Sequence, residues 1–146
     1  MTMFNQDRHQ LRQAYHLVWQ KMQNDAPSMT PLEQQIASVI QLHPEYHALL
    51  GSAEESSQEF PPELGHTNPY LHMGLHIALQ EQIMTDRPVG IRRCYQELLA
   101  KTTDEHQIMH QMIDCLAETL WQAQRDQTAP DEIAYLDRLR QLSKQR

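Results

Sequence analysis

The stretch NPYLHMGLHIALQEQIMTD, residues 68–86, decides the fold of this chain. It predicts a helix, because Asn68 is a favoured N-cap residue and Pro69 suits the first helical position, where its missing N–H costs nothing. Apolar side chains then recur at helical spacing, at Leu71, Leu75, Leu79 and Ile83. Two histidines, His72 and His76, lie on the same side of this helix. Histidines on a face that points to the core need polar partners.

The chain contains two further histidine pairs with the same spacing of four residues. His43 and His47 lie in the segment HPEYH, and His106 and His110 lie in DEHQIMH. Nine histidines placed at random in a chain of 146 residues would give about half of one such pair. Three pairs on three separate segments therefore indicate that these histidines share a function.

The spacing suits metal binding, because side chains four residues apart on a helix lie roughly 6 Å apart on one face. Two imidazoles placed in this way can bind one ion, and a second helix that crosses nearby can complete the ligand set. The sequence therefore predicts a divalent transition-metal site in the core of a helical bundle, with the pairs of residues 68–86 and 104–110 as its main ligands. The HPEYH pair would complete this site or bind a second ion. The predicted metal ligands are His43, His47, His72, His76, His106 and His110.

A ligand set rich in histidine favours zinc, iron or nickel over magnesium or calcium. The chain has neither an HExxH motif nor a repeated Glu-x-x-His pair, which argues against a zinc protease and a ferritin-like site. If the protein is an enzyme, a hydrolase or a transferase, an open metal position would activate water or polarise a substrate, and Glu45 is the nearest candidate base. Glu105 and Asp114 also lie close to the pairs, and Asp114 is either a ligand, an orienting group or a solvated residue. One alternative is a protein without catalysis, whose histidines form a polar cluster in the core. Another is a protein that handles or senses metal without turnover.

The remaining chain predicts more helices, and the expected fold class is all-α. Four main helices are expected, at about 5–24, from Pro31 to near His43, at 68–86 and from Thr102 to about Arg125, with shorter ones at 91–101 and from Pro130 onward. Capping boxes are expected at Thr30 with Glu33 and at Thr102 with Glu105. Pro44 should interrupt the second helix near His43. His9 and His16 face away from the apolar side of the first helix, so we expect them on the surface.

Residues 51–67 are the longest stretch without an apolar period, and they form an acidic loop rich in serine and proline. A connection of this length in a small domain is often functional. His66 comes just before the helix of residues 68–86 and could reach the histidine site. The loop would cover that site, or would bind a partner if the protein is not an enzyme.

Composition narrows the function classes. A chain of 146 residues with 40% hydrophobic and 21% charged side chains fits one globular domain, residues 1–146. The net charge of −7 argues against a nucleic-acid partner. No apolar run is long enough to cross a membrane, and the N-terminus does not look like a secretion signal. Two cysteines, Cys94 and Cys115, are expected as free thiols in a cytoplasmic protein. The expected binding partner is a small molecule, another protein or a second copy of this chain in a homodimer.

Several segments together resemble one known family. HPEYHALL, NPYLHMGLHIALQEQ, DRPVGIR, DEHQIMHQMIDCL and LWQAQR are similar to a bacterial family of small proteins classed as domain of unknown function eighteen forty-one. The resemblance covers nearly the whole chain and implies a small bacterial protein without an assigned activity. The expected architecture is also similar, more loosely, to DinB-like bundles that hold a metal with three histidines, although this chain has more histidine pairs than that pattern.

Overall fold

The computed structural model describes residues 2–24, 28–51 and 68–145. All the regular structure in these residues is helical, which confirms the all-α class. The helices are α1 (Thr2–Gln23), α2 (Pro31–Gln41), the 3-10 helix η1 (Pro44–Tyr46), α3 (His47–Leu50), α5 (Pro69–Thr85), α6 (Ile91–Leu99), α7 (Glu105–Asp126) and α8 (Glu132–Gln145). None of them is long and apolar enough to cross a membrane. The predicted acidic loop, with His66, falls almost entirely outside the described residues.

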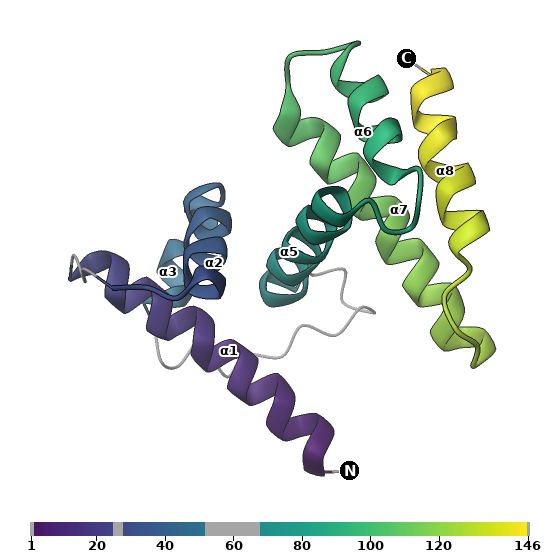
Figure 1. Cartoon of the computed structure of the whole chain (residues 1–146). Coiled ribbons are helices and arrows are strands. Elements are labelled where there is room, and N and C mark those ends of the chain that lie inside the picture. The colour runs from purple at the N-terminus through teal and green to yellow at the C-terminus, as the bar shows by residue number, and fades with distance from the viewer. Residues whose placement is uncertain (1, 25–27, 52–67, 146) are drawn as a thin grey trace. The chain divides into compact units, whose positions relative to one another are not determined.

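The chain divides into two compact units, Met1–Met73 and Gly74–Arg146. The division falls inside α5, so the first turn of that helix belongs to the first unit and the remainder belongs to the second. In the first unit α1 packs against α2 and α3 (Figure 1). Buried side chains of this unit include Tyr15, Val18, Ile36, Val39, Ile40 and Leu50.

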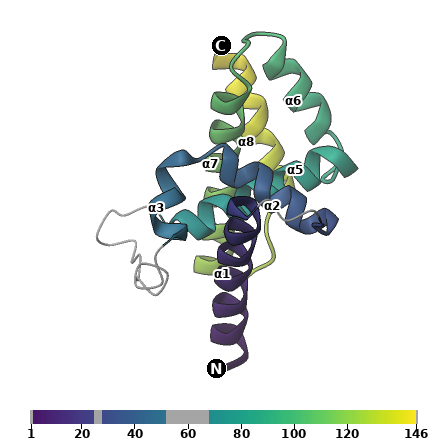
Figure 2. The same ribbon diagram turned by 90° about the vertical axis from the view of Figure 1, so that its left-hand side faces the viewer.

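The second unit is built on α6, α7 and α8. Helix α8 packs against both α6 and α7, and Figure 2 shows the three helices side by side in a second view. Leu79 of α5, Leu98 of α6, Met112 of α7 and Leu139 of α8 are each fully buried in one hydrophobic core. We predicted α6 and α8 as minor helices, but α8 has 14 residues and contributes to this core. The predicted arrangement of four main helices is not confirmed.

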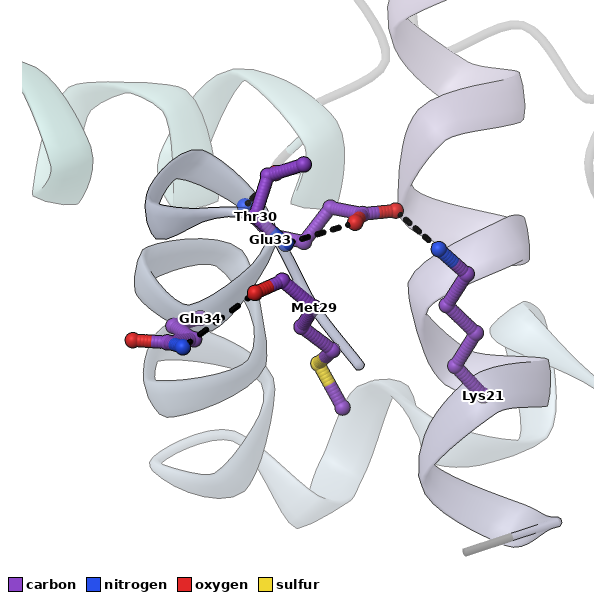
Figure 3. Close-up of polar contacts among 5 residues, drawn as sticks. All are labelled: Lys21, Met29, Thr30, Glu33 and Gln34. Atoms are coloured by element: carbon purple, nitrogen blue, oxygen red, sulfur yellow. Dashed lines mark hydrogen bonds and ion pairs between the residues drawn. The ribbon is translucent and has the colours of Figure 1, made fainter. Parts of the chain in front are cut away.

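The start of α2 follows the predicted capping box (Figure 3). Glu33 N–H donates to Thr30 Oγ1 over 3.1 Å, and Thr30 N–H donates to Glu33 Oε1 over 2.9 Å. Lys21 on α1 donates to Glu33 Oε2 over 2.7 Å, so the same carboxylate also joins α2 to α1. This hydrogen bond is the main reason that the pKa of Glu33 is lowered. The Glu33 carboxylate therefore completes the cap of α2 and also holds α2 against α1.

The second predicted capping box is wrong. The N-cap of α7 is Asp104, whose carboxylate accepts from Gln107 N–H over 3.0 Å. Thr102 Oγ1 instead accepts from Asp104 N–H, and Glu105 accepts from the Tyr95 hydroxyl over 2.6 Å. Asp and Thr are both favoured cap residues, and here the carboxylate takes that position.

Helix α5 begins as predicted, since Asn68 Oδ1 accepts from Tyr70 N–H and Leu71 N–H. Its predicted apolar stripe is wrong at Leu71, which is 58% exposed. At about 100° per residue the buried arc of α5 is centred near His76, and Leu71 lies about 140° from that position. The most buried face of α5 therefore contains a histidine at its centre. Leu32 on α2 and Ile133 on α8 are also exposed.

Candidate metal centre

The first unit brings together one histidine from the end of α2 and one from the first turn of α5. His43 Nε2 and His72 Nε2 lie 3.2 Å apart, and the two rings meet edge to face with centroids 4.9 Å apart. His43 is fully buried. These two residues belong to different predicted pairs, so the contact between them could not be read from the spacing in the sequence.

The backbone around Pro44 explains how His43 reaches this position. Helix α2 ends at Gln41, and His43 adopts φ −129° and ψ 67°, outside the helical region. The residue before a proline is pushed out of the helical conformation by the proline ring. The predicted interruption near His43 is therefore confirmed, and it turns this side chain away from the helical register of His47.

The tautomer of His43 follows from its second hydrogen bond. His43 Nδ1 lies 2.9 Å from the carbonyl oxygen of Val39. A carbonyl only accepts, so Nδ1 carries the hydrogen, and Nε2 of the neutral ring presents its lone pair toward His72. Histidines that bind metals are oriented by this kind of bond from the other ring nitrogen.

Tyr46 of η1 covers one face of His43. The two rings are stacked, with centroids 5.2 Å apart and planes 8° from parallel, and Tyr46 also meets His72 edge to face at 6.3 Å. Burial raises the pKa of Tyr46, and the charge of Glu45 adds to this effect. Tyr46 therefore packs against both imidazoles.

The second unit brings together three histidines, from α5 and from the first turns of α7. The ring centroid of His76 lies 5.2 Å from that of His110 and 5.9 Å from that of His106. His106 and His110 lie one helical turn apart, with centroids 4.0 Å apart. His76 is fully buried. The structure thus places His76 of α5 beside both histidines of α7.

The structure gives His47 different neighbours. His47 Nε2 donates to the carbonyl oxygen of Ile40 over 3.1 Å, and its ring centroid lies 4.5 Å from that of Trp19. Glu45, the predicted base, is exposed on η1, and Asp114 is exposed on α7. A solvated residue was one of the readings that the sequence allowed for Asp114.

His16 was expected on the surface, and this prediction is wrong. His16 Nδ1 lies 2.8 Å from the carbonyl oxygen of Leu50, and His16 Nε2 lies 2.8 Å from the hydroxyl of Tyr70. Its Nδ1–H donates to the carbonyl and its Nε2 accepts from the phenol. The ring therefore ties α1 to α3 and to the start of α5, a role that no local pattern around residue 16 could reveal. The side chain of His9 lies outside the described side chains.

These observations define an all-α protein whose described residues include a group of neighbouring histidines in each unit, and imidazole nitrogens are common ligands of transition metals. The chain belongs to the family described as Domain of unknown function (DUF1841), whose model matches residues 7–141. No curated protein and no solved structure gives a significant match to the chain. Both cysteines are free, as predicted.

Proposed function

We propose that this protein binds a divalent transition-metal ion through two groups of histidines, His43 with His72 in the first unit and His76 with His110 in the second. The observation that carries the proposal is the arrangement of His43. Its Nδ1 is held by the Val39 carbonyl, and its Nε2 faces the Nε2 of a second histidine at 3.2 Å.

The separation of the two nitrogens supports this proposal. Zinc–nitrogen bonds of 2.0–2.1 Å at the tetrahedral angle place two ligand nitrogens about 3.3–3.4 Å apart. His43 Nε2 and His72 Nε2, at 3.2 Å, nearly meet this requirement. Two rings could therefore accept an ion with little rearrangement.

Helix α5 links the two groups of histidines in the proposal. It is continuous from Pro69 to Thr85, and His72 and His76 are one turn apart on it. Side chains at this spacing share one face of a helix. His72 contacts His43, and His76 contacts His110. Helix α5 therefore supplies one proposed ligand next to His43 and one next to His110.

The proposed metal is zinc, iron or nickel, because the ligands are imidazoles. His106, with its ring centroid 4.0 Å from that of His110, is a further ligand or orients that ring. If the protein is a hydrolase or a transferase, the ion would supply Lewis-acid activation of water or of a substrate. Glu45 would then serve as base, and Glu45→Gln should keep the metal while it removes turnover.

A second candidate function is a structural one without metal. It is favoured by the contact between His43 and His72, which is also a good hydrogen bond if His72 Nε2 carries the proton. In this case the histidines join helices through polar contacts, and the protein acts as a binding partner for another protein.

Metal analysis of protein purified without a histidine tag separates the two functions. The metal proposal predicts about one bound ion per chain and, after exchange to cobalt, visible absorption bands typical of nitrogen ligands. These bands should be lost in His43→Leu and retained in His47→Leu. Protein that is still folded but binds neither zinc, iron, nickel nor cobalt at micromolar concentration would contradict the metal proposal and favour the structural one.

A further inference from the structure

A second candidate site lies within the second unit, between α6 and α8. It is a cavity of about 400 Å³, a size typical of pockets for small molecules. The residues around it that matter here are Gly90, Arg93, Cys94, Glu97, Arg140 and Lys144. None of them belongs to the candidate metal centre.

The charge of this cavity is opposite to that of the chain as a whole. Three cations, Arg93, Arg140 and Lys144, line it together with one carboxylate, Glu97. The whole chain has a net charge of −7. A concentration of positive charge in a concave site raises the local concentration of anions.

The ion pairs next to the cavity leave both arginines able to bind a ligand. Arg93 Nε lies 3.2 Å from Glu97 Oε1, and both side chains are mainly exposed, so the pair is weak. Arg140 Nη1 lies 3.5 Å from Asp137 Oδ1, a long contact. Each guanidinium has five donors in a planar fork that fits two oxygens of a phosphate.

Gly90 lies next to Arg140 on one side of the cavity. Gly90 has φ 107°, a conformation that favours glycine, and a Cβ added there would lie 3.8 Å from Arg140 Nη2. The N–H groups of Gly90 and Arg92 already donate to Asp86 Oδ1, each over 3.1 Å. Anion binding would therefore depend on the arginine side chains, with the start of α6 already capped by a carboxylate.

We propose that this cavity binds a small organic phosphate, such as a sugar phosphate or a nucleoside monophosphate. Arg140 and Arg93 would hold the phosphate, Lys144 would add charge, and the remaining volume would hold the organic part. Burial raises the pKa of Cys94 despite the opposing charge of Arg140, so its thiol stays protonated at neutral pH.

The test is an NMR titration of the full chain after metal has been stripped with chelator and the chelator removed, so that phosphate cannot bind through a metal ion. The probes are ribose 5-phosphate, ribose and inorganic phosphate. The amide of Gly90 and the side-chain Nε–H of Arg140 report on the cavity. We expect saturable shifts with ribose 5-phosphate, weaker ones with inorganic phosphate and none with ribose.

Two substitutions that remove the same charge give the control. Arg140→Gln should weaken binding at least about tenfold, because a charge-assisted contact is lost. Arg125→Gln should change it less than about twofold, since Arg125 lies on α7 and pairs with Asp126. Equal weakening by both changes would show a general effect of net charge and overturn the proposal. Equal binding of ribose and ribose 5-phosphate would also overturn it. So would the absence of any shift when ribose 5-phosphate is present in about tenfold excess over the protein.

Discussion

Replacing His76 by leucine should separate metal binding from folding. His76 is fully buried, and its neighbours within the second unit are the rings of His106 and His110. Leucine fills a similar volume and replaces a buried polar ring by an apolar side chain, a change that is often close to neutral for stability. The free energy of unfolding of metal-free protein should therefore change by less than about 1 kcal/mol.

The metal-loaded protein should respond differently to His76→Leu. An ion present at a hundred times its dissociation constant stabilises the folded state by about 2.7 kcal/mol. For a chain of this length that corresponds to roughly 8 °C in the melting temperature. The variant should lose most of this increase, because it lacks one proposed ligand.

The matched control is His47→Leu, which removes a histidine that contacts Ile40 and Trp19. It should cost about 1 kcal/mol in the free energy of unfolding, since one hydrogen bond is lost. It should keep the full increase in melting temperature on addition of metal. The assay is thermal unfolding by circular dichroism of both variants, with chelator and with stoichiometric zinc. Equal metal-induced increases in wild type and His76→Leu, or a loss confined to His47→Leu, would refute the reasoning.

Three further predictions concern stability. Thr30→Ala should lower the free energy of unfolding by about 1 kcal/mol in urea titrations, because Thr30 caps α2, and Thr30→Ser should restore it. Arg138→Met should cost about 1–2 kcal/mol, since Arg138 donates to Thr119 and Gln122 of α7, and a cost below about 0.3 kcal/mol would contradict this. Burial raises the pKa of Cys115 from 9.0 to about 11, so its contribution to stability is fully present below pH 9 and is lost as pH rises from 9 to 11. Cys115→Ser should reduce this alkaline loss, and an unchanged pH profile would show that the thiol does not cause it.

Local features were predictable from the sequence, because neighbouring residues determine them. The capping box of Thr30 and Glu33 and the interruption at Pro44 both follow from residues within one turn. The choice between Thr102 and Asp104 as cap of α7 was not predictable in this way. Both residue types are good caps, and the position of Glu105 is set by Tyr95 on another helix.

Contacts over long distances in the sequence were beyond prediction. His16 and Tyr70 are 54 positions apart, and their hydrogen bond depends on how α1 packs against the start of α5. A helical pattern places a residue on a face, but it does not say which element covers that face. For the same reason the sequence could not distinguish His16, which has two partners, from a surface histidine.

The histidine pairs illustrate where the spacing argument holds. Positions four apart share a face only within an uninterrupted helix. Pro44 lies between His43 and His47, so His43 contacts His72 while His47 contacts Ile40 and Trp19. The spacing holds on α5, where His72 contacts His43 and His76 contacts His110. The proposal therefore rests on contacts between histidines of different pairs, and α5 supplies one histidine to each contact. The spacing within a pair is only the feature by which the sequence first indicates metal binding.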